Sequence, residues 1–235
     1  QVLGSLLFQR GDPRALGLLL RAVELGQYAH PHDVANLVEA LRATGTPESL
    51  ADAHVVAERA LRLHPRHQDL LNNVAALHID SGNFAAAGEL HARICNLPGR
   101  SGFDVQPCVK SAELLVDGNQ FARAIALTSH WANIYPHSPT LHFLKGLALH
   151  HQEQYEDALV FYAHALEMDP QQPAVLINLG AAYQSLGLVN EAFDTYTRAL
   201  YYTPRDPGLL NNIGSLLGIM GKEAHGVAYL ERALD

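Results

Sequence analysis

Histidine is the residue type in this sequence with the clearest capacity for metal binding, and there are 14 of them. The closest groups are His30 with His32, His64 with His67, and His150 with His151. A zinc site needs three or four ligands, usually with cysteine or carboxylate in register, and neither cysteine lies beside these groups. The first two groups flank prolines, where surface turns are expected. We therefore predict solvated turn histidines, no metal site and no other cofactor.

The two cysteines, Cys95 and Cys108, are the residues that could act as a nucleophile or a redox pair. Two cysteines in 235 residues do not make a disulfide scaffold, and this usage fits a reducing, intracellular and cytoplasmic location. Their positions in the predicted helices favour small buried hydrophobes. The sequence also lacks a Gly-rich phosphate loop, a Gly-x-Ser-x-Gly elbow and a paired-carboxylate setting. We conclude that the chain is not an enzyme.

Recurring asparagines suggest a third chemistry, hydrogen bonding to a peptide backbone. Asn178 and Asn212 lie 34 residues apart, Asn211 precedes Asn212, and Asn73 falls at a related position. A side-chain amide offers a donor and an acceptor, so it can pair with backbone N–H and C=O whatever the peptide sequence. The equivalent positions elsewhere are Glu39, Lys110 and Leu144. Because asparagine is also a common polar residue at this position, we favour a simple surface role for Asn73 and a binding role for Asn178 and Asn212.

Apolar residues accompany these amides at positions that hairpin packing does not require. They are Val109, Phe143, Leu144, Leu147 and Ile177. An exposed apolar patch commonly marks a contact surface, although the same residues could pack against a neighbouring helix or a folded-back terminus. The candidate peptide-binding residues are Asn73, Val109, Lys110, Phe143, Leu144, Leu147, Ile177, Asn178, Asn211 and Asn212.

These side chains lie within a sequence repeat of 34 residues, which sets their positions relative to one another. Gly146, Gly180 and Gly214 are each 34 residues apart, as are Pro136, Pro170 and Pro204. Several residue types in one phase indicate a repeat array. The units are 1–33, 34–67, 68–104, 105–138, 139–172, 173–206 and 207–235. The first is irregular, the third carries a short insertion within 98–104, and the last ends without a polar capping helix, so we expect a fragment of a longer chain.

Each unit predicts two antiparallel helices. In 173–206, Leu176, Gly180 and Tyr183 fall on one helical face, and Ala192 and Tyr196 mark the buried face of a second helix. Gly180 and Ala192 are small enough to let the two helices approach closely. Period-two alternation is absent, so no sheet is expected.

These residues resemble the tetratricopeptide repeat family. Unit 173–206 supplies nearly the full pattern: Leu176, Leu179, Gly180, Tyr183, Ala192, Tyr196, Ala199 and Pro204. Unit 139–172 departs from it with His142 and Lys145 at apolar positions, and 105–138 has Trp131 in place of an alanine. The resemblance implies an all-α, right-handed superhelical solenoid of about seven repeats, whose first helices line a concave groove. The later repeats also look like the repeat domain of O-linked N-acetylglucosamine transferases, in which an asparagine ladder holds substrate peptides.

Charge restricts the class of partner. The formal net charge is −8, from 16 basic and 24 acidic residues, without the basic cluster that nucleic acid or an anionic membrane requires. No apolar run approaches the roughly 20 residues that span a bilayer, so direct membrane insertion is not expected. The groove positions carry more acid than base: Glu39, Asp69, Asp80, Glu113 and Asp117 against Arg42 and Lys110. This balance favours a partner segment with apolar and some basic residues.

The first hypothesis is therefore a protein–protein interaction scaffold that binds an extended or helical segment of another protein in its groove. A second is the substrate-recognition arm of a protein O-glycosyltransferase. A third is a structural subunit of a larger assembly, including one formed by self-association.

Overall fold

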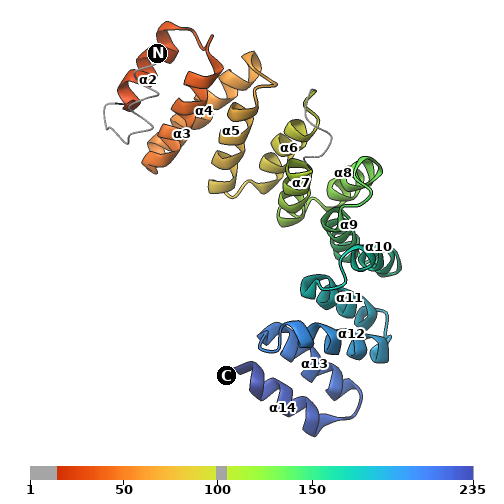
Figure 1. Ribbon diagram of the computed structural model, residues 1–235. Coiled ribbons are helices and arrows are strands. Elements are labelled where there is room, and N and C mark those ends of the chain that lie inside the picture. Colours follow the sequence, from red (N-terminus) through yellow and green to blue (C-terminus); the bar gives the residue numbers. More distant parts are fainter. Residues whose placement is uncertain (1–14, 99–104, 235) are drawn as a thin grey trace. The chain divides into compact units, whose positions relative to one another are not determined.

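All regular structure in the described part of the chain is helical. The computed structural model describes residues 15–98 and 105–234, which contain 13 helices and no strand (Figure 1). The helices are α2 (Ala15–Leu25), α3 (Pro31–Thr44), α4 (Pro47–Leu63), α5 (Gln68–Asp80), α6 (Phe84–Cys95), α7 (Gln106–Asp117), α8 (Phe121–Ile134), α9 (Pro139–His151), α10 (Tyr155–Met168), α11 (Pro173–Ser185), α12 (Val189–Tyr202), α13 (Pro207–Ile219) and α14 (Glu223–Leu234). This confirms the predicted all-α class. None of these helices combines the length and apolarity needed to cross a bilayer.

Two predicted features fall outside the described residues. They are the early turn of the first unit, within 1–14, and most of the insertion, at 99–104.

The described helices form hairpins in chain order: α3 packs on α4, α5 on α6, α9 on α10, α11 on α12 and α13 on α14.

Proline and capping side chains set where the first helices begin. Helices α11 and α13 start at Pro173 and Pro207, since proline has no N–H to satisfy and its fixed φ suits the first helical turn. At α13, Asp206 Oδ1 accepts a hydrogen bond of 2.8 Å from the Leu209 backbone N–H. Gly187, at a φ of 74°, makes the turn from α11 to α12. These local features therefore determine where α11 and α13 begin and where the chain turns from α11 to α12.

Gly180 allows α11 and α12 to approach closely. A Cβ built on Gly180 would lie 2.6 Å from the Tyr196 ring, well inside van der Waals contact. Tyr196 on α12 is 1% exposed and Ala192 is fully buried. The predicted role of Gly180 in close helix packing is thus confirmed, and Ala192 lies on the buried face of α12 as predicted.

Replacing Gly180 with alanine is expected to destabilise the protein by about 1–2 kcal/mol. The new methyl group must displace a buried ring, at an overpacking cost of about 1–3 kcal/mol, of which improved helix propensity recovers at most about 1 kcal/mol. The matched control is Gly218→Ala on α13, where nothing lies within 4 Å of the added Cβ. That change should stabilise by up to about 1 kcal/mol. Urea denaturation measures both, and equal effects would contradict the close-approach argument.

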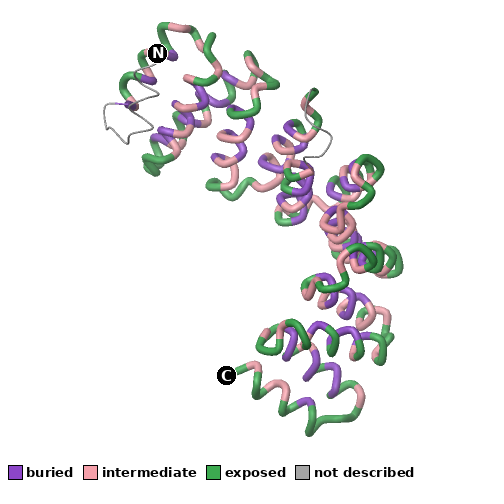
Figure 2. The backbone as a smooth tube through the Cα atoms, viewed as in Figure 1, coloured by how far each residue is buried: buried purple, intermediate pink, exposed green. Residues whose placement is uncertain are grey.

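The helices divide into two compact units, Gln1–Asn119 and Gln120–Asp235. In the described part of the first unit, one core links α2 to α6 through buried residues such as Leu19, Leu37 and Leu70. In the second unit, one cluster surrounds Tyr162 and another surrounds Tyr196. Figure 2 shows the buried residues recurring along the helices of both units, as a repeat array requires. Each unit therefore has a hydrophobic core of its own.

The structure corrects the interpretation of the two cysteines. Cys95, the last residue of α6, and Cys108, in the first turn of α7, form a disulfide. Cys108 is fully buried, as predicted, but Cys95 is half-exposed. Disulfides are typical of oxidising environments, so the cysteines no longer support a reducing compartment.

Candidate peptide-binding face

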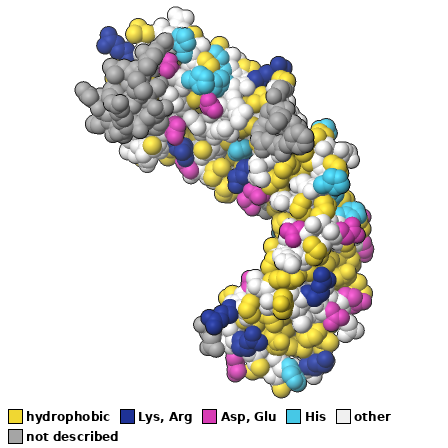
Figure 3. Space-filling view, in the orientation of Figure 1, with side chains coloured by type: hydrophobic (Ala, Val, Ile, Leu, Met, Phe, Trp, Pro, Cys, Tyr) yellow, Lys and Arg dark blue, Asp and Glu magenta, His cyan; other side chains and the backbone are white. Residues whose placement is uncertain are grey.

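The second unit carries most of the predicted binding residues, on its first helices α9, α11 and α13. Phe143 and Leu147 lie on α9 and Ile177 lies on α11, and all three are half-buried. The Phe143 ring centroid lies 6.1 Å from that of Tyr162, so one side of Phe143 covers the core. Figure 3 shows hydrophobic side chains gathered over much of this unit. Partly exposed apolar side chains on adjacent first helices are suited to contact a ligand.

Two members of the predicted apolar patch are core residues instead. Leu144 is 5% exposed and Val109 is 7% exposed. The packing alternative therefore describes them better, because their surface is already covered. Val109 also lies on α7 in the first unit, whereas Phe143, Leu147 and Ile177 belong to the second.

The asparagines occupy three different environments. Asn73 Nδ2 donates a 2.9 Å hydrogen bond to the Ala35 carbonyl on α3, so this amide links two first helices. Asn178 Nδ2 donates to the Ala174 carbonyl of its own helix at 2.8 Å. Asn211 is exposed and Asn212 half-buried on α13. The sequence analysis favoured a simple surface role for Asn73, and its hydrogen bond to α3 was not predicted.

Two acidic groove residues of the first unit, Asp80 and Glu113, form ion pairs. Arg42 Nη1 lies 2.9 Å from Asp80 Oδ2, and Lys110 Nζ lies 3.3 Å from Glu113 Oε2. Lys110 is therefore an exposed ion-pair partner on α7. These pairs reduce the local field along the first helices, so the expected repulsion of anionic peptides is weaker here than counting charges implies.

The two polar departures from the repeat pattern on α9 have a physical explanation. Lys145 Nζ lies 3.9 Å from the centroid of the Phe161 ring on α10, a cation–π contact. Burial lowers the pKa of Lys145, which nearby Asp157 opposes. Burial also lowers the pKa of His142, whose ring lies against Phe161 and His164. An aromatic residue on α10 thus accommodates two polar side chains at apolar positions.

A histidine group in the first unit was missed by the sequence analysis. His32 and His67 were interpreted as separate turn residues, but their rings are 4.4 Å apart and Asp69 contacts His32. Burial first, and then His32, lowers the pKa of His67. The separation of 35 positions along the chain hid this group, because it forms only when α3 and α5 pack side by side.

Family models match part of the second unit. A model described as TPR repeat matches residues 146–187, and one described as tetratricopeptide repeat matches 175–209. These residues include Ile177 and Asn178. No curated protein sequence matches the chain.

Solved structures share the fold. A crystal structure of MamA is 17% identical, with a TM-score of 0.60 over 68% of this chain and 92% of that one. MamA 41-end from Desulfovibrio magneticus RS-1 is 14% identical, with a TM-score of 0.62 over 71% of this chain and 93% of its own. At these identities the similarity establishes the fold and nothing more about function.

Proposed function

Because residues 146–209 are tetratricopeptide repeats within an all-α solenoid, we propose that the chain is a non-catalytic protein-binding scaffold. In this proposal, the first helices of the second unit bind a segment of a partner protein. The observation that carries it is the placement of Phe143, Leu147 and Ile177, half-buried on adjacent helices of one unit. We call the surface formed by these three residues with Asn178, Asn211 and Asn212 the α9–α13 face.

The chemistry of this face defines the ligand. The apolar side chains of α9 and α11 favour apolar anchors, which lose water on contact. On α13, the exposed Asn211 and half-buried Asn212 can pair with backbone or polar groups of the segment. The excess of acidic over basic residues in the chain favours a segment that also carries basic residues. The ligand is therefore an extended or helical segment with apolar anchors and some positive charge.

Blocking the α9–α13 face should weaken partner binding without unfolding the protein. We expect Asn211→Arg to reduce capture of the partner at least tenfold, because a long charged side chain is placed on an exposed position of the face. The paired change Phe143→Ser with Ile177→Ser should reduce it further by removing the anchors' contacts. Partners cross-linked to the wild-type chain are identified by mass spectrometry, and the affinity of each variant for the identified segment is then measured.

The matched control is Val160→Ser on α10, an apolar residue that is 50% exposed but lies on a second helix. Its binding should equal wild type. Circular dichroism and thermal melting show whether each variant is folded. Wild-type affinity in folded Asn211→Arg, or equal loss in Val160→Ser, would overturn the placement of the site.

The substrate arm of a protein O-glycosyltransferase is the second candidate function, favoured by the 34-residue spacing of Asn178 and Asn212. Amides that hold a peptide backbone are indifferent to peptide sequence. Replacing both asparagines by alanine should then reduce the affinity for unrelated peptides equally, whereas recognition through apolar anchors predicts a loss of affinity that depends on the peptide.

Self-association through the same face is the third candidate function. Sedimentation of the wild type compared with Asn211→Arg tests it.

A further inference from the structure

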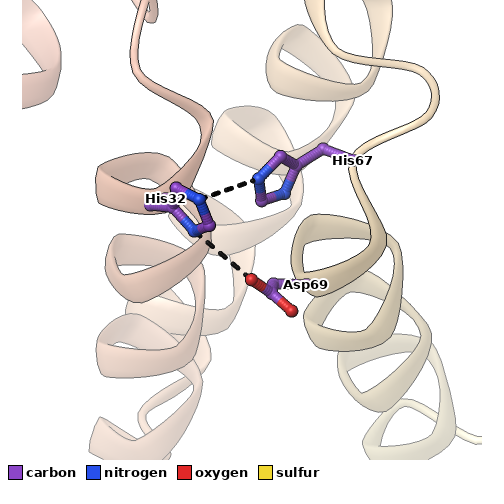
Figure 4. A group of neighbouring side chains, drawn as sticks. All are labelled: His32, His67 and Asp69. Atoms are coloured by element: carbon purple, nitrogen blue, oxygen red, sulfur yellow. Dashed lines mark hydrogen bonds and ion pairs between the residues drawn. The ribbon is translucent and has the colours of Figure 1, made fainter.

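His32, His67 and Asp69 meet on the surface of the first unit, where α3 and α5 lie side by side. His32 is the second residue of α3, His67 immediately precedes α5, and Asp69 is the second residue of α5. Figure 4 shows His32 reaching across from α3 to both partners. Within residues 15–98 and 105–234, these three side chains have ligand atoms within 4.8 Å of one another. The group therefore joins two successive helical hairpins.

The separation of the two imidazoles fits a shared metal ion better than a hydrogen bond. His32 Nε2 and His67 Nε2 are 3.4 Å apart. Hydrogen bonds between nitrogen donors and their acceptors are usually about 2.7–3.2 Å long, so this contact is a poor one. By contrast, a tetrahedral zinc ion with Zn–N bonds of about 2.0–2.1 Å holds neighbouring nitrogens about 3.4 Å apart. The two Nε2 atoms already have the spacing of metal ligands.

Asp69 has the position of a carboxylate that orients a ligating histidine. Its Oδ2 lies 3.3 Å from His32 Nδ1, the ring nitrogen that does not face His67. When Nδ1–H donates to a carboxylate, the Nε2 lone pair is left available for a metal, and the ring is held in place. His67 Nδ1 accepts a long 3.4 Å contact from the Leu70 N–H at the start of α5. Metal binding at Nε2 places the ring proton on Nδ1, so the site forms at the cost of this weak N-cap contact.

A third histidine near this group, His64, is not available as a metal ligand. His64 Nε2 lies 2.6 Å from the Tyr28 carbonyl, so this ring is already engaged. The side chains of His32 and Asp69 are 73% and 61% exposed, which gives an ion direct access and lets water complete its coordination.

We propose that His32 and His67 bind a divalent transition-metal ion through their Nε2 atoms, with Asp69 orienting His32. Imidazole ligands suit zinc, copper and nickel, whereas calcium and magnesium prefer oxygen. With two protein ligands the site binds less tightly than a four-ligand structural zinc site. Because its ligands come from two hairpins, the bound ion links α3 to α5 and favours the folded first unit.

Titration with Zn²⁺ tests the proposal on the full chain, produced without a histidine tag and treated first with EDTA. We expect one zinc ion per chain by calorimetry. At a free zinc concentration of 100 times Kd, the melting temperature should rise by about 5–10 °C. EDTA should reverse the rise, and magnesium should not produce it.

Three variants separate this site from adventitious binding to scattered histidines. His32→Ala should weaken zinc binding at least tenfold, and Asp69→Asn, which keeps both ligands, by about 10–100-fold, the usual cost of losing an orienting partner. The matched control is His137→Ala, an exposed histidine of another inter-repeat turn, which should bind as wild type. Melting without zinc shows that each variant is folded.

The proposal is overturned by unchanged affinity in His32→Ala, which removes a proposed ligand, and the orienting role of Asp69 is overturned by unchanged affinity in Asp69→Asn. An equal loss in His137→Ala would also overturn the proposal, since it would show binding to scattered histidines. Absence of a one-to-one complex with the wild type has the same consequence.

Discussion

Tyr196→Ala is expected to lower the free energy of unfolding by about 3–5 kcal/mol, the usual cost of deleting a large buried aromatic side chain. The ring is 1% exposed and lies directly over Gly180, where the absence of a Cβ makes room for it. It belongs to the cluster that joins α11 and α12 to α13, including Leu176, Leu209 and Ile213. The neighbouring helices cannot close over so large a void without losing these contacts. Chemical denaturation followed by circular dichroism measures the loss.

Tyr196→Phe is the control, because it keeps the ring and removes only the hydroxyl. That hydroxyl donates to Gln184 Oε1 at 3.1 Å, so its loss should cost about 0.5–1.5 kcal/mol. Burial raises the pKa of Tyr196 to about 12. A raised pKa in the folded state means that stability is complete below the ordinary value of about 10 and falls as the pH rises toward 12. Tyr196→Phe should therefore lose less stability than wild type over this range. A cost of Tyr196→Ala near that of Tyr196→Phe would contradict the packing argument.

The helical hairpins were predictable because local rules determine them. Gly180 lies where two helices approach closely, and Pro173 lies where α11 begins, so residues that recur at the 34-residue spacing mark features of the fold. Burial of an entire helical face also follows from periodicity. The exposure of a single residue does not follow from periodicity. Phe143 and Leu144 are neighbours, yet Phe143 is half-exposed and Leu144 is in the core. That difference depends on the exact rotation of α9 against α10.

Contacts between repeats were not predictable in the same way. His32 meets His67 only because successive first helices lie side by side, and the sequence gives no signal for a pair 35 residues apart. Asn73 illustrates the same limit, because its hydrogen bond to Ala35 depends on the stacking of α5 against α3. The substitution of His142 and Lys145 for apolar residues becomes intelligible only once Phe161 is placed beside them. Repeat periodicity therefore predicts each hairpin well, but it predicts poorly the polar contacts between one hairpin and the next.

The disulfide was missed because cysteine count is a weak guide to pairing. Cys95 and Cys108 are 13 residues apart, with the predicted insertion between them. Their Cα atoms are 5.1 Å apart because α6 and α7 pack tightly across the connection. The same packing places Ser111 Oγ 2.7 Å from the Gly88 carbonyl as a buried hydrogen-bond donor. Only the spatial arrangement of these two helices brings the thiols together.

Loss of this disulfide is expected to lower the free energy of unfolding by about 3 kcal/mol. Closing a loop of this length removes chain entropy from the unfolded state, and the standard estimate for a loop of about 15 residues is about 3 kcal/mol. The double variant Cys95→Ala with Cys108→Ala should show the loss by urea denaturation. Alanine is preferred to serine at Cys108 because that position is fully buried and a hydroxyl there would add the cost of an unsatisfied polar group.

Adding a reductant tests the contribution of the disulfide bond separately from the contribution of the two cysteine side chains. A reductant should destabilise the wild type by a similar amount, because the buried Cys108 side chain is kept and only the cross-link is lost. The same reductant should leave the double alanine variant unchanged. The helices should still pair after reduction, because Ser111 and the apolar residues between α6 and α7 continue to hold them. Two freely reacting thiols in the native, untreated protein would contradict the cross-link, as would wild-type stability that is insensitive to reductant.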